Sequence, residues 1–423
     1  MSTILTIENI EKFKLQLMYW ASQFSHFCIL DNHENDNFEQ RFQFIAGIDQ
    51  IDFFKITADN YNSFESWKSA KKSMVFGLFS YELNHSIHKI PIKSQEHSLG
   101  YFFEPRYLIQ IRGNKVEINR NYPETYDLVV KIQEMEINSR FHQDDSFKLK
   151  CNKTKEKYIE DIIDIKLKIE EGTFYEINYC MEWMASNAAI DPCEKFYELN
   201  ALSKAPFSAF LKMEDQYILC ASPERFLKKE GLKLLSQPIK GTIKRNKENR
   251  EEDEKLKSIL LHSEKERAEN IMIVDLVRHD LTPYSMTGSI KVVELFGIYA
   301  FEFVFQMISS IEATLVQESD ALKALKYAFP PGSMTGAPKH EVMKQIEKYE
   351  SFSRNYFSGS IGYIDENQDF DFNVVIRSCF YNDKLKNLSI KAGSAITYES
   401  IPEAEYDECL LKANALIQLL SKG

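Results

Sequence analysis

Hydrophobic and polar residues alternate with two different periods along the chain, which predicts a mixture of strands and helices. Residues 73–83 form an almost unbroken apolar run typical of a buried strand, and residues 101–112 alternate in the manner of a half-buried one. Apolar positions recur with helical spacing over residues 155–171, and Gly172 follows as a natural helix stop. Both periods therefore occur in the first half of the chain.

The second half continues this mixture. A charged helix is expected from about Asn249 into the apolar run 271–277. A Gly/Pro-rich turn at 330–338 precedes a helix that ends near Tyr349, and a last helix starts at Pro402. Because no strict strand–helix–strand rhythm appears, we predict an α+β fold rather than a doubly wound one. Further strands are expected at residues 207–213, 217–221 and 233–238 and near Ile361 and Val374.

The length of 423 residues is enough for about two or three domains. The polar stretch from Asn138 to Asp145 is the best candidate for a boundary or a surface loop. We therefore divide the chain into an N-terminal part, residues 1–147, and a C-terminal region, residues 148–423.

Charge and composition exclude several classes of function. The net charge of -11 offers no basic surface that could release counterions from nucleic acid or from an anionic membrane. The first residues lack the features of a signal peptide, and no apolar run approaches the roughly 20 residues that cross a bilayer. Seven cysteines without a Cys-x-x-Cys pair oppose a disulfide framework and a zinc site. We expect a cytoplasmic protein with no nucleic-acid or membrane partner.

Lys240 is the first candidate for chemistry. It lies in the run Pro238-Ile-Lys240-Gly-Thr242, sixteen positions after Glu224. A hairpin would bring this amine and the Glu224 carboxyl group together as a nucleophile and a proton donor. The alternative is that Lys240 is a solvated turn residue, as a lysine before a glycine usually is.

Two pairs of glutamates have a spacing that fits a metal site. Glu266 and Glu269 are three positions apart on one predicted helix. Glu405 and Glu408 repeat this spacing on the last helix, and Lys412 follows one turn later. Two converging carboxylate pairs would form an all-oxygen site for Mg2+, an ion that also contacts substrate anions. The alternative is that both pairs lie on solvated faces.

Further residues are suited to binding an anion. The turn from Gly332 to Lys339, which contains Thr335, leads into a helix, and helix N-termini attract negative charge. Arg377 interrupts an apolar run and could hold a carboxylate through two hydrogen bonds. Tyr363 offers a hydroxyl group and Gly393 a close approach of the backbone. Each also has an ordinary interpretation as a helix start, a strand-end arginine, a core tyrosine or a bulge.

In their order along the chain, these segments resemble the chorismate-utilising enzymes. The resemblance extends from Glu170 to Lys412, while the N-terminal part shares only Ile29-Leu-Asp31 and Phe76-Gly-Leu-Phe-Ser-Tyr81. The matching segments are Ser222-Pro-Glu-Arg-Phe, Pro238-Ile-Lys-Gly-Thr, Glu269-Asn-Ile-Met-Ile-Val-Asp-Leu-Val-Arg278, Gly332 to Lys339, Gly359-Ser-Ile-Gly-Tyr363, Ile376-Arg377 and Pro402-Glu-Ala-Glu-Tyr-Asp-Glu408.

The resemblance implies a four-layer α/β/β/α sandwich with the active site between its sheets. Residues 1–147 would complete this sandwich, and residues 148–423 would form the chorismate-binding catalytic region. Within the family, aminodeoxychorismate synthases characteristically have lysine at the position of Lys240, where anthranilate, isochorismate and salicylate synthases have alanine. The resemblance to the former implies conversion of chorismate and ammonia to 4-amino-4-deoxychorismate, a precursor of 4-aminobenzoate and folate. Ammonia would come from a partner glutamine amidotransferase.

The resemblance also implies a role for each candidate residue. Lys240 would attack C2 of the chorismate ring with an amine whose pKa desolvation has lowered, and Glu224 would protonate the departing C4 hydroxyl group. Mg2+ would bind the ring carboxylate, held by Glu269 and Glu408 with support from Glu266 and Glu405. The remaining substrate-binding residues would be Arg377, Tyr363 and Gly393 at the enolpyruvyl carboxylate, together with Thr335, Lys412 and Thr242.

Two positions depart from the family pattern. Glu176 stands where relatives usually have glutamine or lysine, and the absence of a lysine argues against an isochorismate-type reaction. Gln306 stands where many relatives have a histidine, which leaves more of the proton transfer to Glu224. Anthranilate synthase component I and a catalytically silent regulator that binds chorismate or tryptophan remain as alternatives. The run Leu30-Asp-Asn32 is similar to the family's tryptophan-binding segment but predicts no ligand.

Overall fold

The computed structural model describes residues 3–35, 37–90, 98–118, 125–137 and 147–421, so the boundary expected at residues 138–145 lies outside the described residues. The helices are α1 (Ile10–Ser22), α2 (Tyr61–Ala70), α3 (Leu83–His88), α4 (Thr125–Gln133), α5 (Lys155–Glu170), α6 (Pro192–Ser203), α7 (Arg250–His262), α8 (Glu264–Leu281), α9 (Ala321–Ala328), α10 (Lys339–Tyr349) and α11 (Pro402–Ser421), with short 3-10 turns at Thr282–Tyr284, Glu318–Asp320 and Gly332–Met334.

The strands are β1 (Thr3–Thr6), β2 (His26–Asp31), β3 (Phe44–Ile56), β4 (Val75–Phe79), β5 (Gly100–Arg112), β6 (Lys115–Ile118), β7 (Lys150–Cys151), β8 (Glu176–Ala185), β9 (Phe207–Met213), β10 (Gln216–Ser222), β11 (Arg225–Glu230), β12 (Lys233–Gln237), β13 (Ile239–Lys244), β14 (Lys291–Ala300), β15 (Val304–Thr314), β16 (Gly336–Ala337), β17 (Ser360–Ile364), β18 (Phe370–Asn373), β19 (Ser378–Asn382) and β20 (Asn387–Ile396). Among the described residues, no helix combines the length and apolarity that a membrane crossing needs.

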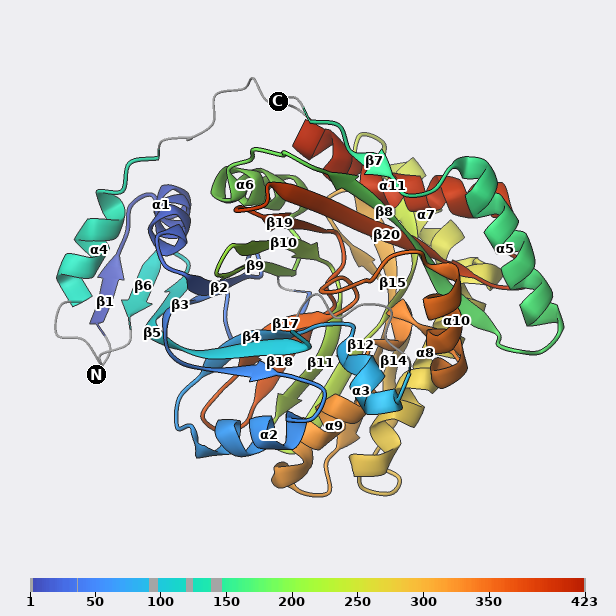
Figure 1. The fold of residues 1–423 in the computed structure, drawn as a ribbon, viewed down its shortest axis with the longest axis horizontal. Helices are drawn as coiled ribbons and strands as arrows, with labels where there is room; N and C mark the ends of the chain where they lie inside the picture. Colours follow the sequence, from blue (N-terminus) through green and yellow to red (C-terminus); the bar gives the residue numbers. More distant parts are fainter. Residues whose placement is uncertain (1–2, 36, 91–97, 119–124, 138–146, 422–423) are drawn as a thin grey trace.

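Helices cover the outer faces of two layers of antiparallel strands (Figure 1). In the upper layer, α6 and α11 lie over β10, β19 and β20, and in the lower layer α2 and α9 lie beneath β4 and β18. Side chains of β2 alternate between the two resulting cores: Phe27 packs in the core that includes Phe13 of α1 and Phe196 of α6, whereas Cys28 packs in the core between the sheets with Phe76. The predicted α+β fold and four-layer α/β/β/α sandwich are confirmed.

Strands from before and after residue 147 pair with each other. β2 pairs with β9, and β4 pairs with β17, both in antiparallel register. The N-terminal strands therefore complete the sheets that also contain the strands of the C-terminal region.

Most of the elements predicted from hydrophobic spacing are present, with three differences. The charged helix is two helices, which meet at Ser263, and the Ser263 hydroxyl group accepts a hydrogen bond from the N–H of Glu266. The apolar run 73–83 contains a strand only at β4. The strand expected near Val374 ends one residue earlier, at Asn373.

A buried ion pair between Arg354 and Glu350 connects the segments around the site. The guanidinium group donates to both carboxylate oxygens, from Nε at 2.8 Å and from Nη2 at 2.6 Å. It also donates to the carbonyl oxygens of Met334 at 2.6 Å and Asn178 at 2.8 Å, while Glu350 accepts from the N–H of Cys180. The pair therefore fixes β8 and the loop at Gly332–Met334 to the end of α10.

We predict that Arg354→Ala lowers the free energy of unfolding by about 3–5 kcal/mol, because it leaves the Glu350 carboxylate buried without its charged partner. Arg354→Lys keeps the charge but loses the two parallel hydrogen bonds, so its loss should be intermediate. Urea unfolding measures both. Arg278→Ala serves as the control, since it breaks an exposed pair with Asp275 and should change stability by less than about 1 kcal/mol. Equal losses for Arg354→Ala and Arg278→Ala would contradict the role of the buried pair.

Candidate active site

A hairpin places Glu224 beside the start of β13, as predicted. Strands β11 and β12 pair antiparallel, with Arg225 opposite Gln237, and the N–H of Ile239 donates to Glu224 Oε1 at 3.4 Å. Lys240 follows directly. At Gly241 the backbone takes a φ of 89°, and a Cβ there would lie 3.0 Å from a carboxylate oxygen of Glu266. A glycine is thus required for β13 to approach α8 this closely.

The Lys240 amine points into the protein interior, where it meets Glu176. Lys240 Nζ lies 2.5 Å from Glu176 Oε1, and the side chains are 8% and 1% exposed. Among the described residues, the structure records no other hydrogen-bond acceptor for this amine and no partner for Glu176 Oε2. Glu176 is the first residue of β8, and the β8–β16 pairing sets it opposite Ala337. Its position is therefore fixed by backbone hydrogen bonds.

The two predicted reacting groups have shifted pKa values, in one case against expectation. Burial acts to lower the pKa of Lys240, but the carboxylates of Glu176, Glu269 and Glu224 outweigh it and raise the pKa above its ordinary value. The prediction of a lowered lysine pKa is therefore wrong for this structure, in which the amine is an ion-paired ammonium group. Burial raises the pKa of Glu224 to about 7, which suits a proton donor.

The two glutamate pairs lie on facing sides of two helices. Lys265 of α8 reaches across to α11: its Nζ lies 3.1 Å from Glu405 Oε1 and 3.9 Å from Glu269 Oε1. Lys412 Nζ lies 2.6 Å from Glu408 Oε1. The facing sides of the two helices therefore form one acidic cluster, bounded by two lysines.

Two carboxylate oxygens of this cluster accept no recorded hydrogen bond from the described residues. Glu269 Oε1 and Glu405 Oε2 are buried, and no hydrogen-bond partner is recorded for them within the described chain. Burial raises the pKa of Glu269 to about 8, although Lys240 opposes this shift, and burial raises the pKa of Glu266 as well, against the opposing charge of Lys265. Carboxylate oxygens are the kind of donor that Mg2+ takes, so the expected cation site stays a prediction.

Three of the predicted substrate-binding residues lie together beside this cluster. Arg377 Nη1 donates to the carbonyl oxygen of Lys412 at 2.9 Å, and Lys412 Nζ donates to that of Gly393 at 3.0 Å. Arg377 does not continue a strand, because it lies between β18 and β19 with a φ of 53°. The result is a half-buried pair of cations next to the carboxylates.

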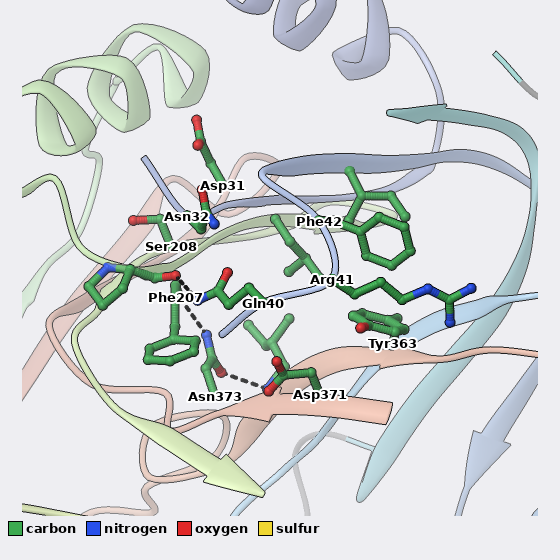
Figure 2. Close-up of a pocket in the computed structure, with 14 residues that line it drawn as sticks. Asp31, Asn32, Gln40, Arg41, Phe42, Phe207, Ser208, Tyr363, Asp371 and Asn373 are labelled. Carbon is green, nitrogen blue, oxygen red and sulfur yellow. Dashed lines mark hydrogen bonds between the residues drawn. The ribbon is translucent and has the colours of Figure 1, made fainter. Parts of the chain in front are cut away.

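Tyr363 does not lie with this group, so the structure gives no support to its predicted contact with the enolpyruvyl carboxylate. Its ring packs against Phe42 and Phe76, with centroids 5.3 and 6.4 Å away. It lines a separate pocket (Figure 2), whose described lining includes neither Arg377 nor Lys240. Successive side chains of a strand point to opposite faces of the sheet. The side chain of Tyr363 is on the face of β17 that borders this pocket.

The same pocket is lined by the segment that resembles a tryptophan-binding one. Leu30, Asp31 and Asn32 form one wall, and residues 206–208 form another. Asn373 also lines the pocket, and its Nδ2 donates to the carbonyl oxygen of Phe207 at 2.9 Å. The pocket thus lies where strands of the N-terminal part meet strands of the C-terminal region.

Two threonines differ from the rest of the predicted site. Thr335 is fully buried, and its hydroxyl group donates to the carbonyl oxygen of Gly332 at 3.1 Å, so that it secures its own loop. Its predicted contact with a substrate is not present in this arrangement. Thr242 is exposed on β13, beyond the irregularity at Gly241, and its role stays a prediction.

Two contacts of the site were not predicted from the sequence. Lys265 lies four residues before Glu269 on α8, so helical spacing could have indicated their contact. The contact of Glu176 with Lys240 joins residues 64 positions apart, and no local pattern signals it. Gln306, noted for its departure from histidine, is buried opposite Thr242 in the pairing of β13 with β15, and its Oε1 has no recorded hydrogen-bond partner among the described residues.

Relatives of this chain include proteins that act on chorismate. Aminodeoxychorismate synthase component 1 of Escherichia coli (strain K12) is 38% identical over 271 residues, which are 64% of this chain and 59% of that protein. The protein of the same name from Bacillus subtilis (strain 168) is 34% identical over 267 residues, 63% of this chain and 56% of that one. Anthranilate synthase component 1 of Saccharolobus solfataricus is 36% identical over 226 residues, 53% of each chain. The matched part is thus somewhat more than half of each relative's length.

Solved structures share the fold at lower sequence identity. Anthranilate synthase component I from Streptococcus pneumoniae TIGR4 superposes with a TM-score of 0.76 at 22% identity, over 93% of this chain and 92% of that one. MenF, the menaquinone-specific isochorismate synthase from Escherichia coli, gives 0.76 at 16% identity, over 100% and 95%. The family of chorismate binding enzymes matches residues 18–418, and the chain therefore belongs to this family.

Proposed function

We propose that the protein is component I of an aminodeoxychorismate synthase, which converts chorismate and ammonia to 4-amino-4-deoxychorismate for 4-aminobenzoate and folate synthesis. The observation that carries this proposal is a buried lysine amine, Lys240, beside the protonatable Glu224 and the acidic cluster. Family membership and the relatives of that name support it. Anthranilate synthase component I is the second candidate because one relative has that name, but Lys240 is not needed for its reaction.

In the proposed reaction, Lys240 forms a bond to C2 of the ring while the C4–O bond breaks, and Glu224 gives its proton to the departing hydroxide. Ammonia then adds at C4 and the lysine leaves from C2. Arg377 and Lys412 are cations suited to hold a carboxylate of the substrate.

The proposal includes a cation, a partner and a location. Glu269 and Glu408, with Glu266 and Glu405, would hold Mg2+, which when bound would neutralise the ring carboxylate. A separate glutamine amidotransferase would supply ammonia, in line with the designation component 1 of the relatives. We place the protein in the cytoplasm.

Incubation with chorismate, Mg2+ and ammonium tests the function, because 4-amino-4-deoxychorismate becomes 4-aminobenzoate only after addition of a lyase. We expect Lys240→Ala to lower product formation by at least about 100-fold and to change chorismate binding by less than about threefold. Lys233→Ala, on the exposed part of the adjacent hairpin, is the matched control. Fluorescent anthranilate formed without a lyase would instead identify the second candidate.

The rate should depend on pH through Glu224. A carboxyl group with a pKa of about 7 carries its proton below that pH and loses it above, so kcat/KM should fall as pH rises through about 7. Glu224→Gln should abolish most activity and remove this descending limb. Steady-state rates from pH 5.5 to 9 in both proteins measure the effect, and a limb that persists in Glu224→Gln would assign it to another group.

Addition of Mg2+ should raise the Tm of the protein, because a ligand that binds only the folded state stabilises it. Glu408→Gln removes one charge from the cluster and should raise the Mg2+ concentration for half the Tm shift by at least about tenfold. Glu399→Gln, an exposed residue just before α11, is the control. An unchanged Mg2+ response in Glu408→Gln would exclude the cluster as the cation site.

A further inference from the structure

The contact between Lys240 and Glu176 is unusual for a nucleophile. An ammonium group has no lone pair, so Lys240 must lose a proton before it can attack carbon. Both side chains are buried, so the nearest acceptor for this proton is a group of the protein rather than bulk water. The acceptor must be a group that already touches it.

Four other carboxylates face the amine from the surrounding elements, and each has another task. Glu224, from the turn between β10 and β11, has to carry a proton for the leaving group. Glu266 and Glu269 of α8 and Glu408 of α11 belong to the acidic cluster. The structure records a hydrogen bond from Lys240 to none of these four, whereas Glu176 Oε1 lies 2.5 Å away.

Glu176 has the features of a prepared base. Its second oxygen, Oε2, is buried without a recorded partner in the described chain, so a proton can be held there without displacing a hydrogen bond. The backbone at Glu176 is fixed by β16, where Gly336 has a φ of 142° and a Cβ would lie 2.0 Å from the Glu176 carbonyl oxygen. A glutamine, as found in similar enzymes, could hold the amine in place but could not accept its proton.

We propose that Glu176 is the base that takes the proton from Lys240 before attack and returns it when the lysine leaves. This inference rests on the proposed function. The N–H bond of the ammonium group breaks to give a neutral amine and a carboxylic acid at Glu176. The amine then forms the C–N bond at C2, and the hydroxide from C4 leaves as water with the proton of Glu224. After ammonia has added at C4, the released amine recovers its proton from Glu176, and Glu224 is reprotonated by the new ammonium group.

The test is the rate of the covalent adduct on Lys240, followed by rapid quenching and intact mass with chorismate and Mg2+ but without ammonia. We expect Glu176→Gln to be at least about 100-fold slower than the wild type at pH 6. At pH 9 the difference between the two rates should shrink by at least about tenfold, because a larger fraction of the amine is then already neutral when the substrate binds. Without the Glu176 charge, burial lowers the lysine pKa and assists this recovery.

Glu176→Asp keeps a carboxylate at a greater distance and should retain the wild-type pH dependence at a reduced rate. A loss in Glu176→Gln that is equal at every pH would assign Glu176 a structural role and overturn the inference, as would wild-type rates throughout. Absence of both adduct and product in the wild type would instead overturn the proposed function. Wild-type adduct formation together with an unaffected Glu176→Gln would overturn this inference alone.

Discussion

An ion pair without access to solvent, between Arg354 and Glu350, holds the site together. Removing two charges from water costs several kcal/mol per ion, and only complete hydrogen bonding offsets that cost. The pair meets this demand by bonding to carbonyl and N–H groups of β8 and of the loop at Gly332–Met334. These segments cannot shift without leaving a buried charge unsatisfied. Glu176, at the start of β8, is therefore held by a residue that takes no part in the reaction.

The proposed chemistry depends on neighbouring carboxyl groups in opposite protonation states. Burial favours the protonated form of Glu224. At Glu176 the ammonium group of Lys240 supplies a compensating positive charge at 2.5 Å. The charge of Lys240 thus makes Glu176 suited to be a base, whereas Glu224 is suited to be an acid. In the proposed reaction an acidic protein would thereby keep a reactive amine, because Glu176 would hold its proton.

Much of the site follows from local spacing in the sequence. The hairpin that brings Glu224 to β13 and the pairs on α8 and α11 depend on short-range geometry, which sequence patterns describe well. Tyr363 was misplaced because the face of a strand that a side chain occupies depends on its partners, which no local pattern fixes. The protonation of Lys240 was also misjudged, since desolvation can be predicted from burial but the opposing charge of Glu176 comes from a strand 64 residues away.

The arrangement of the site also depends on Gly336, a residue that does not react. Its missing side chain lets β16 lie against β8 at the backbone of Glu176. Any larger residue there would push the strands apart and lengthen the path of the proton, although every group that reacts would still be present. Natural variation or library screening would then record an inactive protein with an intact set of catalytic residues. Position 336 therefore constrains the evolution of this cleft through distance, because the close contact is with the backbone at Glu176 and no change of side chain there would relieve it.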